Sequence, residues 1–153
     1  MDVDAAALDD VAGFVRLAAV VERWFGPMEA DPGFHEALRR NIERGSAFVV
    51  RAVGARLLGG ILTGGRAPRF GINWLVVDAA ARRRGVGRAL VDHVTGLYPR
   101  PCQVDVVTFG VDHPAARQTG ARAFYERLGF VAGDAAPDGP DGGSRQTFHL
   151  WLT

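Results

Sequence analysis

The sequence predicts a single α+β domain, spanning residues 1–153, in which helices cover a partly parallel β-sheet. The length and the 48% hydrophobic content suit one core that buries roughly two thirds of the unfolded chain's surface. Two helical patterns and a hairpin occupy the first half, whereas strands and helices alternate in the second half. Because alternation requires a crossover between parallel strands, the two halves together predict a mixed sheet.

The N-terminal segment is expected to hold a short edge strand, at residues 3–7, and one long helix. Apolar residues recur at helical spacing from Val11 onward, and Asp9 or Asp10 precedes them as an N-cap. The pattern continues to about Trp24, where we expect this helix to end.

A second helix and a hairpin follow. Asp31 is a residue type favoured at N-caps, Pro32 suits the first helical position, and Gly45 is a typical C-terminal stop. Two β-rich runs then lie on either side of a short glycine turn, at 46–53 and 56–63, which predicts an antiparallel pair.

Strands and helices alternate through the rest of the chain. A segment rich in Gly, Pro and Asp, at 133–145, predicts a mobile loop before the last strand. The other expected elements are strand 69–77, helix 87–97, strand 104–109, helix 116–128, a strand near Phe130 and strand 146–152.

The composition excludes several kinds of site. All 18 basic residues are arginine, so the chain lacks the lysine that a P-loop nucleotide site requires. Cys102 is the only cysteine, which excludes an internal disulfide and a cysteine-rich zinc site. Arg39 stands where a zincin motif needs its second histidine, and neither serine lies in the Gly-x-Ser-x-Gly pattern of hydrolases. We therefore expect no metal and no serine nucleophile.

Charge and hydropathy limit the partners and the location. Four of the first ten residues are aspartate, where a secretory signal needs positive charge, and no apolar run approaches the roughly 18 residues of a membrane span. The arginine run lacks a wider basic surface, so nucleic acid is not an expected partner. We expect a cytoplasmic protein that does not bind membranes.

The segment from Arg82 to Arg88 reads Arg-Arg-Arg-Gly-Val-Gly-Arg, between an expected strand and an expected helix. A glycine-rich turn at a helix start presents unpaired backbone N–H groups and the positive end of the helix dipole, and arginines add guanidinium donors. Leu90 replaces the third glycine of the dinucleotide fingerprint, so that motif is absent. The segment predicts an anion site, although a solvated surface turn would have the same composition.

A second segment, from Ala121 to Phe130, reads Ala-Arg-Ala-Phe-Tyr-Glu-Arg-Leu-Gly-Phe, a helix that ends at glycine and leads into an apolar run. Together with the first segment, which fits the pattern Arg/Gln-x-x-Gly-x-Gly/Ala, it resembles the GCN5-related N-acetyltransferase family. The resemblance covers roughly residues 47–130. It implies a central mixed, mostly antiparallel sheet with a splayed parallel strand pair and about four helices on its faces.

The resemblance implies that acetyl-coenzyme A lies along this strand and loop. Backbone groups of the splayed strand would contact the pantetheine arm, and the loop amides would face the pyrophosphate. Glycines would allow close approach because they lack a Cβ atom. Gln118 stands where relatives often have an asparagine that contacts the pantetheine. The implied cofactor-binding residues are Leu75, Val76, Val77, Arg82, Arg83, Arg84, Gly85, Val86, Gly87, Arg88, Ala89 and Gln118.

The resemblance also implies that Tyr125 protonates the departing thiolate, and a tyrosine with an ordinary pKa near 10 is protonated at neutral pH. The acceptor amine, with a pKa of about 10.4, must lose a proton. Many relatives use a strand glutamate, but the strand at 72–77 has no carboxylate. Asp105 on the next strand is the first candidate base, directly or through a water, with Asp112 and His113 behind it. A solvent-facing strand residue and a turn former are the alternatives.

The junction of the first two helices normally forms one wall of the acceptor cleft in the family. Here it carries Trp24, Phe25, Met28 and Glu29, whose aromatic area and carboxylate suit a cationic amine. Aromatic residues at a helix end are also typical of core packing. Trp24, Phe25 and Glu29 are the candidate substrate-binding residues.

The sequence thus predicts an N-acetyltransferase that uses acetyl-coenzyme A as co-substrate and transfers the acetyl group directly to a primary amine in a ternary complex. A backbone N–H at Val76 or Val77 would stabilise the oxyanion. The acceptor is a small molecule or a protein amine, and its identity is open. The alternative is a non-catalytic module of the same fold that binds coenzyme A to sense or scaffold. Homodimers are common among relatives, so a homodimer is one option for the oligomeric state.

Overall fold

The computed structural model describes residues 1–153, which form seven strands, six α-helices and two short 3-10 helices. The strands are β1 (Asp4–Ala5), β2 (Ala47–Arg51), β3 (Leu57–Arg66), β4 (Arg69–Val77), β5 (Cys102–Phe109), β6 (Val131–Ala136) and β7 (Arg145–Leu152). The helices are α1 (Val11–Ala19), α2 (Glu22–Phe25), α3 (Pro32–Glu43), α4 (Val86–Leu97), α5 (Pro114–Thr119) and α6 (Ala121–Arg127). The 3-10 helices are η1 (Leu8–Asp10) and η2 (Ala79–Ala81).

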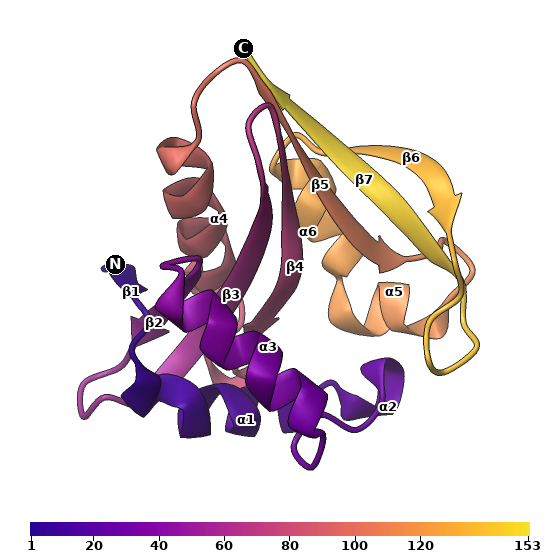
Figure 1. The fold of residues 1–153 in the computed structure, drawn as a ribbon. Helices are drawn as coiled ribbons and strands as arrows, with labels where there is room; N and C mark the ends of the chain where they lie inside the picture. The colour runs from indigo at the N-terminus through magenta and orange to yellow at the C-terminus, as the bar shows by residue number, and fades with distance from the viewer. The chain divides into compact units, whose positions relative to one another are not determined.

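The strands form one sheet in the order β1-β2-β3-β4-β5-β7-β6 (Figure 1). The pairs β1–β2, β2–β3, β5–β7 and β6–β7 are antiparallel, whereas β4 and β5 run parallel. The parallel register runs from Arg69 opposite Gln103 to Ile72 opposite Val106. This confirms the predicted α+β class with a mixed, mostly antiparallel sheet. None of the helices combines the length and the apolar character that a membrane crossing requires.

The chain divides into two compact units. The first contains Met1–Gly64 and Asn73–Leu97, and the second contains Gly65–Ile72 and Tyr98–Thr153. Strand β4 contributes residues to both units, because its first four residues belong to the second unit and the rest to the first.

In the first unit, successive residues of β2 point to opposite faces of the sheet, as the pleat requires. Val49 is fully buried in the cluster that α1 and α3 cover, whereas the Phe48 ring lies 4.9 Å from the ring of His93 on α4. Two adjacent glycines of β3 allow close packing on both faces. A Cβ at Gly59 would lie 2.7 Å from Val86 of α4, and one at Gly60 would lie 2.5 Å from Phe14 of α1.

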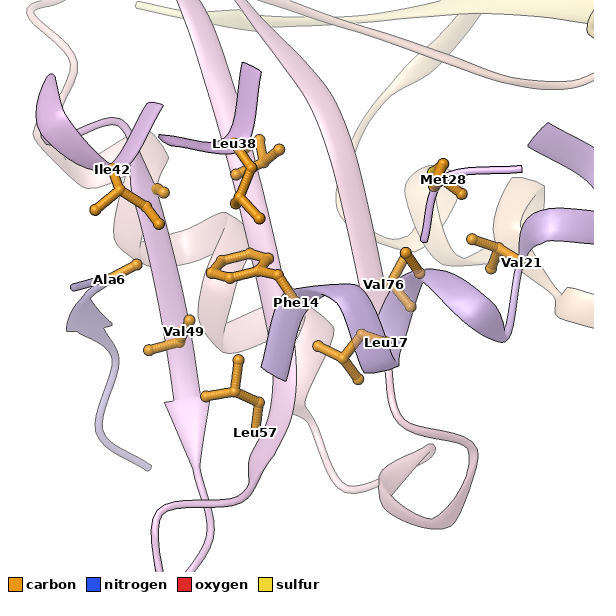
Figure 2. Close-up of a cluster of buried hydrophobic side chains, with 13 residues drawn as sticks. Ala6, Phe14, Leu17, Val21, Met28, Leu38, Ile42, Val49, Leu57 and Val76 are labelled. Atoms are coloured by element: carbon orange, nitrogen blue, oxygen red, sulfur yellow. The ribbon is translucent and has the colours of Figure 1, made fainter. Parts of the chain in front are cut away.

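An apolar cluster of this unit joins α1 and α3 to the sheet (Figure 2). Phe14, Leu17 and Leu38 have no exposed surface, and the indole of Trp74 packs against the cluster from β4. Burying a large apolar side chain contributes about 1.5–3 kcal/mol, so this cluster is a main source of the unit's stability. It also fixes the face of β4 that carries Trp74 and Val76.

Two of the four expected helices are each broken in two. The first pattern, expected to run to about Trp24, gives α1 and α2, because Val21, with a φ of −113° and a ψ of 3°, leaves helical geometry between them. The helix expected at 116–128 begins two residues earlier and is interrupted at Gly120, whose φ is +67°. The link from β5 to α5, residues 110–113, is therefore shorter than the link at 110–115 that the expected bounds imply.

The cap predictions for α3 are confirmed. Asp31 accepts a hydrogen bond from the Gly33 N–H at 2.9 Å, Pro32 is the first helical residue, and Gly45 follows the helix with a φ of +74°. The expected strand at 3–7 is shorter than predicted, since β1 contains only Asp4–Ala5.

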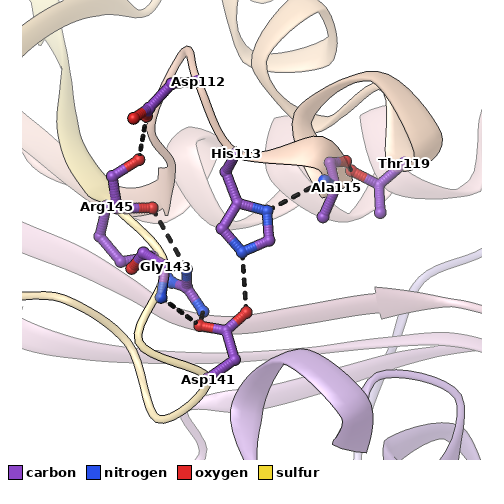
Figure 3. A network of polar contacts seen from close by, with 8 residues as sticks. Asp112, His113, Ala115, Thr119, Asp141, Gly143 and Arg145 are labelled. Atoms are coloured by element: carbon purple, nitrogen blue, oxygen red, sulfur yellow. Dashed lines mark hydrogen bonds and ion pairs between the residues drawn. The ribbon is translucent and has the colours of Figure 1, made fainter.

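The segment at 133–145, expected to be a mobile loop, contains the end of a strand and a set of side-chain hydrogen bonds. Its first residues belong to β6, and the rest of the segment forms a polar network with the start of α5 (Figure 3). Asp141 accepts hydrogen bonds from His113 Nε2 at 2.7 Å, from the Gly143 N–H at 2.9 Å and from Arg145 at 3.1 Å. The predicted loop is confirmed for residues 137–144, whereas the prediction was wrong for residues 133–136, which belong to β6. Composition does not reveal the long-range partners of the loop.

Candidate active site

The loop between β4 and α4 is the segment in which the sequence predicts an anion site. Gly85, with a φ of +82°, turns the chain into α4, and a Cβ there would meet no atom within 4 Å. Arg83 also has a positive φ, of 65°, which is uncommon for a residue with a side chain. Ala81 and Val86 are buried at either end, so the loop is anchored while its middle is exposed.

The arginines of this loop project into solvent. Arg82, Arg83 and Arg84 are exposed and have no ion-pair partner, whereas Arg88 lies 3.6 Å from Asp92 one turn further along α4. The first amides of α4 lack helical partners, as in any helix. The Ala89 N–H, in contrast, donates to the Gly85 carbonyl at 2.9 Å, so it belongs to the helix ladder rather than to the unpaired donors.

The end of β4 directs alternate backbone groups to its two edges. The Asp78 N–H donates to the Leu58 carbonyl of β3 at 2.8 Å. Because backbone direction alternates along a strand, Val76 also faces β3, whereas Leu75 and Val77 direct their N–H and C=O groups to the opposite edge of β4. Of the two predicted oxyanion donors, this geometry favours Val77.

Tyr125 lies on α6 and is 7% exposed. Its ring contacts Phe130 edge to face, at 5.4 Å between centroids. Its hydroxyl has no hydrogen-bond partner in the structure. Burial raises the pKa of Tyr125 above its ordinary value of 10.0. The phenol therefore stays protonated throughout the physiological range.

Asp105 is held by several donors on the surface of the sheet. Its carboxylate accepts hydrogen bonds from His149 at 2.5 Å, from Gln103 at 2.8 Å and from Arg69 at 2.8 Å. Partial burial raises the pKa of Asp105, but these donors outweigh burial and the net pKa is lowered. A lowered pKa makes the carboxylate a weaker proton acceptor, so the structure does not favour Asp105 alone as a base.

His149 is the residue that sequence reasoning missed at this position. It stands directly opposite Asp105 on β7, and because a carboxylate only accepts, its Nδ1 carries the proton of their hydrogen bond. Nε2 then has no hydrogen-bond partner and lies against the backbone of Gly133. Only the strand register reveals this pair, since the two residues are far apart in the sequence.

The two reserve candidates for the base have structural roles. His113 accepts from the Ala115 N–H through Nδ1 at 2.9 Å and donates from Nε2 to Asp141, so both ring nitrogens are used. Asp112 accepts from the Ser144 hydroxyl, and that hydrogen bond lowers the pKa of Asp112. Gln118, the candidate pantetheine contact, is exposed on α5.

The predicted acceptor residues lie around a loop that Glu22 organises. Its carboxylate accepts from the Met28 N–H at 3.1 Å and from the Glu29 N–H at 2.8 Å. Met28 is buried and Trp24 packs against the core, whereas Phe25 is 39% exposed. The Glu29 side chain is exposed and has no ion-pair partner. Phe25 and Glu29 are thus the accessible members of the predicted set.

A family model described as acetyltransferase (GNAT) domain matches residues 43–132. A search of curated proteins found no match to the sequence. Among solved structures, Ard1 from Thermoplasma volcanium is 21% identical with a TM-score of 0.77, covering 99% of this chain and 97% of that chain. The ribosomal-protein-S18-alanine N-acetyltransferase from Escherichia coli is 19% identical with a TM-score of 0.71, covering 99% and 94%. The GNAT-like decarboxylase GphF, solved with isobutyryl-CoA, is 18% identical with a TM-score of 0.73, covering 100% of both chains.

Proposed function

Because this chain belongs to the GNAT acetyltransferase family, we propose that it transfers an acetyl group from acetyl-coenzyme A to a primary amine, directly and in a ternary complex. The loop after β4 carries this proposal. It combines the Gly85 turn, the start of α4 and three arginines without carboxylate partners, within the region that the family model matches. Backbone N–H groups and guanidinium groups gathered at one place suit the two charges of a diphosphate.

The edge of β4 that faces away from β3 would hold the pantetheine arm and the reacting carbonyl. Leu75 and Val77 direct their backbone groups to that edge. The Val77 N–H is the proposed oxyanion donor, since a fixed N–H aimed at developing negative charge lowers the barrier. Removing one such donor from an enzyme raises the barrier by about 3–4 kcal/mol.

Tyr125 is the proposed general acid. Its raised pKa keeps the O–H protonated, and no other group of the protein uses the hydroxyl. The hydroxyl would donate a hydrogen bond to the sulfur as the C–S bond breaks and negative charge develops there. Because a simple thiol has a pKa of about 8.5, below that of the phenol, full proton transfer from Tyr125 is uphill, and the role of the hydroxyl as acid lies in stabilising the developing thiolate.

Asp105 and His149 together are the proposed base. The carboxylate holds the Nδ1 proton, which leaves the Nε2 lone pair for the proton of an amine or of an intervening water. In such a pair the imidazole takes the proton and the carboxylate stabilises the imidazolium. With His149 as the proton acceptor, the weak basicity that follows from the lowered pKa of Asp105 is compatible with catalysis.

Phe25 and Glu29 are proposed to contact the acceptor, with Trp24 supporting them from the core. An exposed ring and an unpaired carboxylate attract a cationic amine. The acetyltransferase neighbour from Escherichia coli acts on an alanine of a ribosomal protein, so peptide N-termini belong among the acceptors to test.

The test is a turnover assay with acetyl-coenzyme A and a panel of amines that includes peptide N-termini, polyamines and amino acids. We expect release of free thiol that depends on the amine, and acetylated amine in equal amount by mass spectrometry. Tight coenzyme A binding without turnover on any amine would contradict the proposal. It would support the alternative, a non-catalytic coenzyme A-binding module.

One observation favours that alternative. The expected catalytic carboxylate, Asp105, is fully engaged by neighbouring donors. The GphF neighbour is a decarboxylase on the same fold, so the fold by itself does not decide the reaction.

A further inference from the structure

Asp78, the first residue after β4, is a buried carboxylate where the strand turns into the arginine-rich loop. It is 7% exposed. Its side chain accepts hydrogen bonds from Arg56 at 2.9 Å, from Arg16 at 3.3 Å and from the Ala80 N–H at 3.3 Å. The last of these caps η2, the short helix that leads directly into the loop.

The two arginines tie this corner to distant parts of the first unit. Arg16 comes from α1 and also donates to the Leu57 carbonyl at 2.6 Å, at the start of β3. Arg56 comes from the turn between β2 and β3. Three separate segments therefore meet at one carboxylate, and the Asp78 N–H adds a fourth contact through Leu58.

These contacts also remove a repulsive charge. A free carboxylate four residues before Arg82 would disfavour a nearby diphosphate, because like charges repel strongly where water is scarce. Here the charge of Asp78 is matched by two guanidinium groups, those of Arg16 on α1 and of Arg56 in the hairpin turn, and not by the exposed arginines 82–84. The exposed arginines 82–84 therefore form no ion pair with Asp78 and are available to bind an anionic ligand.

We propose that Asp78 is a positioning residue for coenzyme A: through Arg16, Arg56 and the Ala80 N–H it holds the loop at 79–85 in its binding conformation. This inference rests on the proposed function, because it assumes that the loop binds the diphosphate. Asp78 itself does not touch the ligand. Its loss should therefore weaken the diphosphate contacts and leave the pantetheine contacts intact.

The chain offers a matched control. Asp10 is equally buried, at 8% exposed, and it likewise accepts hydrogen bonds from one backbone N–H, that of Ala7, and from an arginine, Arg51. It caps a short helix far along the chain from the loop. Asp10→Asn should lose comparable stability without changing the loop.

The experiment compares Asp78→Asn with Asp10→Asn and wild type by calorimetric titration with coenzyme A and with pantetheine, which has no phosphate. We expect Asp78→Asn to bind coenzyme A at least tenfold more weakly, with unchanged pantetheine affinity, and Asp10→Asn to match wild type for both ligands. Hydrogen exchange without ligand should be faster at residues 79–87 in Asp78→Asn alone. Asp78→Glu, which can restore the arginine contacts, should recover part of the affinity.

Three results would overturn the inference. These are wild-type coenzyme A affinity in Asp78→Asn, an equal loss for pantetheine, or an equal loss in Asp10→Asn. If Asp78→Asn does not fold, Arg56→Gln replaces it, because Arg56 is largely exposed and the ion pair between Arg16 and Asp78 remains. We then expect affinity for coenzyme A to fall about threefold and affinity for pantetheine to stay unchanged. Wild-type protein that binds no coenzyme A would instead overturn the proposed function and this inference with it.

Discussion

His113 and Asp141, 28 positions apart in the sequence, share a hydrogen bond of 2.7 Å that joins the start of α5 to the β6–β7 loop (Figure 3). The other ring nitrogen of His113 caps α5 by accepting from Ala115. A Cβ at Gly143 would overlap the imidazole, so the loop fits closely around it. The pair therefore orders a loop and a helix start at once.

Replacing Asp141 by Asn should destabilise the fold by about 2 kcal/mol. The change replaces the charged acceptor of the hydrogen bonds from Arg145 and from the His113 N–H by a neutral one, and hydrogen bonds to a charged group contribute more than neutral ones. Chemical denaturation measures the effect. Asp138→Asn, an exposed position in the same loop, is the control and should change stability by less than about 0.5 kcal/mol. Equal effects at both positions would contradict the role of the network.

The contribution of Asp141 should depend on pH in a defined window. Desolvation raises the pKa of Asp141, but the Gly143 N–H, His113 and Arg145 outweigh it and lower the pKa from 3.8 to about 2. A lowered folded-state pKa stabilises the fold above the unfolded-state pKa, and the benefit is lost as the pH falls toward the folded-state value. The difference in unfolding free energy between wild type and Asp141→Asn should stay level above about pH 4 and decrease toward pH 2. A level difference down to pH 2 would be evidence against the shift.

Gly85→Ala and Gly96→Ala should change stability in opposite directions. A Cβ at either glycine meets no atom within 4 Å, so neither change causes a clash. Gly85 has a φ of +82°, where alanine costs about 1 kcal/mol, whereas Gly96 lies within α4, where alanine gains about 0.5–1 kcal/mol. Thermal unfolding gives both values, and only Gly85→Ala should also weaken coenzyme A binding.

Tyr125→Phe should reduce turnover by about a hundredfold or more and leave coenzyme A affinity nearly unchanged. The hydroxyl has no partner within the protein, so its removal should alter the free energy of unfolding by less than about 1 kcal/mol. Steady-state kinetics with calorimetric binding separates the two quantities. An unchanged rate would remove Tyr125 as the general acid.

Asp105→Asn and His149→Gln should lower turnover by similar factors if the two residues act as one base. Residues that act as a unit are not additive, so the double variant should be little worse than either single one. In wild type, kcat/KM should fall at low pH as the base becomes protonated, and this fall should be absent in both variants. Variants with wild-type profiles would show that this pair only supports the sheet.

Local patterns predicted the parts of the fold that neighbouring residues determine. Asp31, Pro32 and Gly45 act through their own backbone and adjacent amides, so the sequence alone places α3 correctly. The turn at Gly85 and the start of α4 were likewise predicted from local sequence, because a glycine followed by a helical pattern indicates them without any contact to a distant segment.

The remainder depends on contacts between distant segments. Asp78 accepts hydrogen bonds from Arg16 and Arg56, which lie 62 and 22 positions away. The local sequence Asp-Ala-Ala-Ala does not indicate either partner. The pairing of Asp105 with His149 follows only from the register of two strands. Sequence reasoning predicted the loop proposed to bind the anion but not Asp78, the residue proposed to position it.

The cations in the ion pairs with Asp10, Asp78 and Asp141 are arginines, because the chain contains no lysine. A guanidinium keeps its proton at any physiological pH and is a poor nucleophile, unlike the neutral amine of a lysine. Under the proposed function, the chain would therefore expose no side-chain amine to the bound thioester. Its arginine charges would resist self-acylation, however long the thioester stays bound.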